Sequence, residues 1–159
     1  MADSDAARAW GNLQQLYGAV RRRLDQGIEG EAGCSLADHD LLTALRCSER
    51  GKLQMLDLAD RLGVTRGGLT RIIDRHVDRG WVRRDRPEHN RREVYAVLTE
   101  EGGRVLEAAR AVYLRVLSET LERHLDEGEL AGFLECSEKL LREVAGTGCG
   151  EGGHPGISV

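Results

Sequence analysis

The chain has 159 residues, of which 40% are apolar and 31% are charged, and its formal net charge is −4. This length fits about one domain and can bury a core without disulfides or metal. Two Trp, three Tyr and one Phe are too few for a protein that stacks single-stranded bases on aromatic rings. Because no apolar run approaches a membrane span and the acidic start does not resemble a signal peptide, we expect a helix-rich cytoplasmic protein without membrane contact.

The N-terminal part of the chain has the periodicity of helices. Apolar residues at three- and four-residue steps predict a long amphipathic helix from about residue 5 to 29, ended by Gly30 and Gly33. A Ser-x-x-Asp capping box at 35–38 predicts a second helix that stops near Gly51.

Two shorter helices follow, at about 55–62 and 65–80, with Thr65 as the N-cap of the second. Two small residues, Ala59 and Gly63, allow these helices to cross tightly, and the glycine suits the turn between them. The periodicity of the second helix places five side chains inward: Leu69, Ile72, Ile73, His76 and Val77. Five others are predicted to point outward: Arg66, Thr70, Arg71, Asp74 and Arg75.

The period then changes to that of a β-hairpin. Residues 81–86 and 93–98 are expected to form two strands joined by a polar turn. Thr99 begins a helix of some 25 residues, and an Asp-x-x-Glu capping box at 126–129 begins the last helix. The glycine-rich end, 146–159, is predicted to be a disordered tail.

This order of elements predicts a mainly α protein with a small β-hairpin wing. We expect a winged helix-turn-helix lobe over residues 34–99. The helices at 5–33 and 100–145 are too long to be covered by that lobe and are predicted to dimerise.

The charge distribution points to nucleic acid, although the whole chain is acidic. Nine arginines stand against four acidic residues between Thr65 and Arg92, which is an electrostatic footprint. The exposed face of the second short helix, including Arg75, suits a major groove. The arginines near the hairpin turn suit a minor groove: Arg86, Arg91 and Arg92.

One stretch resembles the signature of MarR-family (multiple antibiotic resistance) regulators: GVTRGGLTRIIDRHVDRGWVRRDRPEHNRREVYAVLTEEG. The resemblance covers residues 10–144 in element order and is most specific over 55–103. It implies a homodimeric, sequence-specific transcription regulator that binds a pseudopalindromic operator in duplex DNA, most simply a repressor released by a small molecule. It also implies that Arg91 and Arg92 lie at the wing tip. Six residues take positions that contact bases and phosphates: Thr65, Arg66, Gly67, Gly68, Thr70 and Arg71.

Other functions were weighed against this interpretation. A small-molecule effector would bind between the dimer helices and the lobes, where the candidate ligands are Tyr17, His39, Arg46 and Tyr113. A thiol-redox regulator of the same fold would use Cys34, Cys47 or Cys136, and a metal-responsive one would use Cys34 with Asp38 and His39. A dimeric scaffold without DNA binding would leave the basic wing unexplained. No catalytic motif and no cofactor or metal motif is present, so no enzyme is expected.

Overall fold

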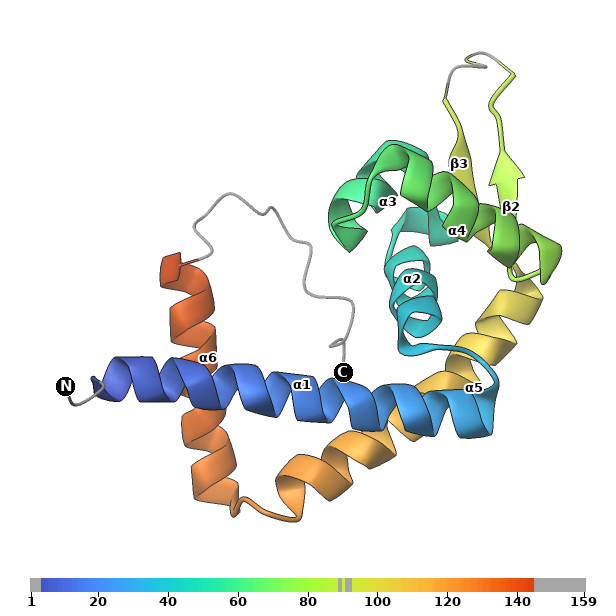
Figure 1. Ribbon diagram of the computed structural model, residues 1–159. Helices are drawn as coiled ribbons and strands as arrows, with labels where there is room; N and C mark the ends of the chain where they lie inside the picture. Colours follow the sequence, from blue (N-terminus) through green and yellow to red (C-terminus); the bar gives the residue numbers. More distant parts are fainter. Residues whose placement is uncertain (1–3, 89, 91–92, 145–159) are drawn as a thin grey trace.

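The computed structural model describes residues 4–88, 90 and 93–144, which form a helical frame with a smaller lobe standing on it (Figure 1). In the frame, α1 (Asp5–Ala32) packs along α5 (Glu100–Leu117). The lobe contains α2 (Leu36–Arg46), α3 (Met55–Leu62), α4 (Arg66–Asp78) and the wing strands. Among these residues, no helix is long and apolar enough to cross a bilayer. The predicted tail, 146–159, lies outside the described residues.

The first helix is longer than the sequence predicted. It continues through Gly30 and ends only at Gly33, which has the left-handed φ of 67°. The expectation that Gly30 ends the helix was therefore wrong. A glycine inside a helix costs about 1 kcal/mol, and the burial of Leu24 and Ile28 against the core offsets that cost.

The second helix begins as predicted but ends earlier. Ser35 accepts from the Asp38 amide and Asp38 accepts from the Ser35 amide, so the capping box is confirmed. The helix ends at Arg46 and not near Gly51, because a 3₁₀ turn follows at Glu49–Gly51. A strand that was not predicted comes next, β1 (Lys52–Gln54).

The helix-turn-helix is confirmed. The third helix spans Met55–Leu62, and Gly63 follows it with a φ of 64° that an L side chain rarely adopts. Thr65 then caps α4 by accepting from the Gly68 amide at 3.1 Å. All five predicted inward residues of α4 are buried or half-buried, and all five predicted outward ones are exposed.

The wing is a three-stranded antiparallel sheet in the order β1-β3-β2, and not the two-stranded hairpin expected. Both predicted strands exist but are shorter, as β2 (Val82–Asp85) and β3 (Tyr95–Leu98). Val82 pairs with Leu98, and Lys52 pairs with Val97 on the other side of β3. The added strand protects one edge of the hairpin.

The start of α5 passes very close to the end of the lobe. Thr99 caps α5 by accepting from the Gly102 amide, and its hydroxyl also lies 2.7 Å from the Gly80 carbonyl and 3.0 Å from the Trp81 carbonyl. A Cβ added at Gly102 would lie 2.1 Å from the Trp81 carbonyl oxygen. Only glycine fits this crossing.

The last two helices differ in how far they are covered. After α5 a π-helical turn, Ser118–Glu122, continues the predicted long helix. The second capping box is confirmed at Asp126 and Glu129, and α6 spans Glu127–Val144. No residue of α6 is buried, whereas α2 lies at the centre of the core and buries seven of its eleven residues.

Candidate nucleic-acid interface

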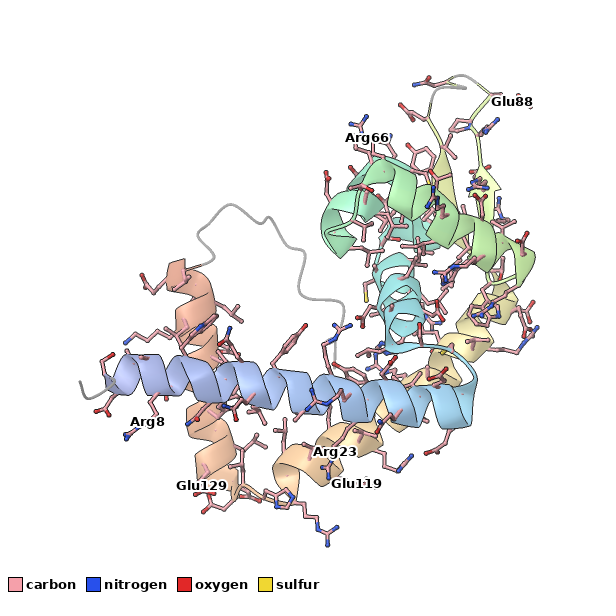
Figure 2. The ribbon with its side chains drawn as sticks, viewed as in Figure 1. Arg8, Arg23, Arg66, Glu88, Glu119 and Glu129 are labelled. Carbon is pink, nitrogen blue, oxygen red and sulfur yellow. The ribbon has the colours of Figure 1, made fainter. Side chains whose placement is uncertain are left out.

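The exposed face of α4 is produced by the burial of its opposite face. Leu69, Ile73 and His76 are at most 1% exposed, and their spacing turns the intervening side chains to solvent. Arg66, Thr70 and Arg71 are all exposed. Figure 2 shows Arg66 at the start of α4, on the side of the lobe away from α1. This face therefore presents arginines from a helix that is anchored by its other side.

Both threonines at the start of α4 have partners inside the helix. Thr65 accepts from Gly68, and the Thr70 hydroxyl donates to the Arg66 carbonyl at 3.0 Å. These hydroxyls therefore bond within the helix, whereas the side chains of Arg66 and Arg71 are exposed. A side chain at Gly67 would enter open space, so the backbone itself is accessible at that position.

The wing is joined to α4 by an ion pair that the sequence analysis did not identify. Arg84 on β2 donates to Asp74 on α4 at 2.7 Å and lies 3.5 Å from the Thr70 carbonyl oxygen. Asp74 and Arg84 stand ten residues apart in the sequence, and only the aspartate was predicted to point outward. Their pairing cannot be predicted until the position of the hairpin against α4 is known. This pair connects α4 directly to β2 of the wing.

The predicted wing arginines are only partly placed. Arg86 is exposed just after β2, and Figure 2 shows Glu88 further along the wing on the same side of the lobe as Arg66. Arg91 and Arg92 lie outside the described residues. Arg75 is exposed on the C-terminal half of α4 and also borders a cavity.

This cavity has a volume of about 400 Å³ and lies between α1, the start of α2 and the helix-turn-helix. Its charged lining includes Arg21, Asp38 and Arg79, which the sequence analysis did not propose as effector ligands. Gly33, in the turn between α1 and α2, also lines this cavity.

The four residues proposed to bind an effector do not gather in that cavity, and none of them is among its lining residues. Two of them meet each other, because the ring of buried His39 stacks on Tyr113 with centroids 4.7 Å apart. Arg46 pairs with Glu107 on the surface, and Tyr17 is exposed on α1. Of the four proposed effector ligands, only His39 and Tyr113 therefore contact each other.

The cysteines differ in exposure, and the suggested metal ligands do not form a site. Cys34 is buried, whereas Cys47 and Cys136 are exposed. Burial and the nearby Asp38 carboxylate raise the pKa of Cys34 to about 11, which opposes the thiolate that a redox sensor needs. Within the described part of the chain, no three His, Cys, Asp or Glu side chains converge to hold a metal ion.

This environment predicts slow chemistry at Cys34. Thiolate is the reactive form, so a pKa of about 11 should make alkylation of Cys34 near pH 8 on the order of 100-fold slower than that of an ordinary exposed thiol. The check is timed labelling with iodoacetamide followed by peptide mass analysis. Exposed Cys47 is the internal control, and equal rates at the two residues would contradict the prediction.

The chain is similar to known proteins over nearly its whole length. The MarR family model matches residues 35–94. The multiple antibiotic resistance protein MarR of Escherichia coli is 31% identical over 134 residues, which are 84% of this chain and 89% of that protein.

Solved structures have the same fold. Sco3205, a MarR family transcriptional regulator from Streptomyces coelicolor in complex with DNA, superposes with a TM-score of 0.77 at 22% identity and covers 94% of this chain and 95% of its own. Wild-type MarR from E. coli in its apo form gives a TM-score of 0.74 at 23% identity over 89% of this chain and 99% of its own. The match to E. coli MarR over most of both chains shows that this chain belongs to the MarR family of transcription regulators.

Proposed function

We propose that this chain binds duplex DNA in a sequence-specific manner, with α4 in the major groove and the wing over the minor groove. The observation that carries the proposal is the exposed arginine face of α4, anchored by its buried face and braced to the wing by Arg84 and Asp74. Similar structures solved with DNA support this placement. The contacts proposed are those of the sequence analysis: Thr65, Arg66, Gly67, Gly68, Thr70, Arg71, Arg75, Arg86, Arg91 and Arg92.

Selection from random duplexes tests the proposal. The full chain should enrich a two-fold-symmetric sequence with half-sites about one helical turn apart. Its affinity should fall steeply with salt, because arginine–phosphate contacts release counterions. Retention of no duplex at low salt, or of every duplex equally, would contradict sequence-specific binding.

We further propose that the protein acts as a homodimer built from residues 5–33 and 100–145, with residues 34–99 as the DNA-binding lobe. Large apolar side chains of the frame helices are exposed in the single chain: Trp10, Leu13, Leu16, Tyr17, Leu114, Phe133, Leu134, Leu140, Leu141 and Val144. Apolar surface gathered on helices that lack a cover within the chain indicates an interface. A second copy supplies matching helices by two-fold symmetry.

Charging this surface should separate the dimer. The double variant Leu134→Asp/Leu141→Asp would bury two unpaired carboxylates and should weaken association by about 2 kcal/mol or more. Light scattering at micromolar concentration, with circular dichroism for helix content, measures the result. Leu56→Asp alters an exposed leucine on α3 and should remain a dimer. A wild-type monomer with all helices intact would refute the dimer.

The cavity between α1 and the lobe supports a ligand-responsive repressor. A small molecule there would contact both the frame and α4, and it would release DNA only if it binds better to the free spacing of the lobes. An effector should therefore raise the melting temperature and lower DNA affinity together. No contact among the described residues favours a metal-responsive regulator, and the raised pKa of Cys34 opposes a sensor based on that thiol.

A further inference from the structure

A buried contact between a histidine and a carboxylate joins α4 to the start of α2. His76, on the inner face of α4, is 1% exposed. The sequence predicted that it faces inward, and its burial confirms that prediction. Both nitrogens of its ring, however, face oxygen atoms that only accept hydrogen bonds.

The first of these groups is a backbone carbonyl. The Nδ1 of His76 lies 2.7 Å from the carbonyl oxygen of Ile72, one turn earlier in α4. A carbonyl oxygen only accepts hydrogen bonds. Nδ1 must therefore carry a proton in this geometry.

The second group is a carboxylate. The Nε2 of His76 lies 3.2 Å from Oδ1 of Asp38, whose side chain is 13% exposed. The contact has ion-pair distance without hydrogen-bond geometry. In the neutral ring with its proton on Nδ1, the lone pair of Nε2 would face this oxygen and repel it.

Asp38 is held in its charged form. Burial alone would raise the pKa of Asp38, but His76 and the hydrogen bonds with Ser35 outweigh it and keep that pKa well below its usual range. Its position in the first turn of α2 also favours a negative charge. A second ring proton on Nε2 would turn this contact into a favourable ion pair.

We propose that His76 is a positioning residue for DNA recognition: as a doubly protonated imidazolium it ties the C-terminal half of α4 to Asp38 on α2. The inference rests on the proposed DNA binding, because its role is to orient the helix that reads the groove. Asp38 lies in the first turn of α2. In the same turn, the Leu36 amide donates to the Asp25 carboxylate of α1 at 2.8 Å. The ion pair thus links α4 to the frame.

Few other groups surround the pair. Arg79 at the end of α4 lies 3.5 Å from Oδ2 of Asp38 and covers the ring of Trp81, which meets His76 edge to face. Cys34, with its raised pKa, is neutral. Arg79 is half exposed, so His76 is the buried partner of Asp38. Without its second ring proton, His76 would present a lone pair to that carboxylate, and the docking of α4 on α2 would weaken.

Nitrogen NMR of the wild-type chain tests the charge directly. Both ring nitrogens of His76 should show shifts of protonated nitrogens near neutral pH. In Asp38→Asn, whose amide oxygen can still accept from Ser35, the ring should become neutral with its proton on Nδ1. A neutral His76 in the wild type, or an unchanged ring in Asp38→Asn, would overturn the proposal. This readout stands even if a His76 variant fails to fold.

The pH dependence of DNA affinity tests the positioning role. With a duplex recovered by selection, at constant ionic strength from about pH 5.5 to about pH 8.5 where histidines titrate, wild-type affinity should fall as pH rises. His76→Gln should bind the duplex about 10-fold more weakly than the wild type at the acidic end, and its affinity should no longer fall as pH rises. Adding Asp38→Asn to His76→Gln should cause no further loss of affinity, as expected for residues in direct contact.

Exposed His124 is the matched control, and His124→Gln should keep the wild-type profile. A wild-type profile in His76→Gln, or fully additive losses in the double variant, would refute the positioning role. If the wild type retains no duplex at any pH, the proposed DNA binding fails, while the ring-nitrogen shifts still decide the ion pair.

Discussion

Gly102→Ala should lower the free energy of unfolding by about 3 kcal/mol or more, the upper part of the range for overpacked sites. The added Cβ would lie 2.1 Å from the Trp81 carbonyl oxygen and 2.9 Å from Cδ1 of Leu98. The leucine can rotate, but the carbonyl is backbone and can yield only if α5 moves away from the lobe. Urea unfolding at fixed protein concentration, followed by circular dichroism, measures the loss.

The next residue provides a control of opposite sign. A Cβ at Gly103 meets only the end of Arg46, at 3.8 Å, and Gly103 lies inside α5. Gly103→Ala should therefore stabilise the protein by about 0.5–1 kcal/mol through helix propensity. Equal effects of the two substitutions would mean that α5 does not approach the lobe as described.

Arg66→Ala/Arg71→Ala should lower the affinity for a selected duplex by about 2–6 kcal/mol, since each arginine that meets a base edge contributes about 1–3 kcal/mol. Each phosphate contact that is lost should also flatten the slope of log affinity against log salt by about 0.9. The melting temperature should stay at the wild-type value, because both side chains are exposed. Fluorescence anisotropy over a range of salt concentrations gives both quantities.

Arg104→Ala is the control for charge. Arg104 lies on α5 and pairs with Glu100 and Glu101, so its removal changes the net charge without touching α4. Affinity should remain near the wild-type value. If this variant loses as much affinity as the α4 variant, binding follows the total charge of the protein, and α4 does not read the groove.

Local chemistry made much of this fold predictable. The capping boxes at Ser35 and Asp126 and the N-cap at Thr65 satisfy amides within three residues of themselves, so they place helix starts correctly from sequence. The inner and outer faces of α4 followed from its periodicity for the same reason. The resemblance to the MarR family then predicted how these elements pack together.

Features that depend on distant partners were missed. β1 has three residues and exists because β3 pairs with it. Gly30 stays helical in a helix whose Leu24 and Ile28 are buried in the core. The site shows the same limit. The partners of Asp38 and of Arg84 come from other elements, so neither pair is visible in a local pattern.

The exposed surface of α6 should make the unfolding of the proposed dimer depend on protein concentration. An 18-residue helix with no buried residue is marginal in water on its own, so in the proposed dimer its helicity would depend on the second copy. Folding and assembly then form one bimolecular equilibrium, and the thermal midpoint should rise with total protein concentration. On dilution toward nanomolar levels the chain should lose part of its helical signal, and the number of operators it occupies would depend on how much of it the cell makes.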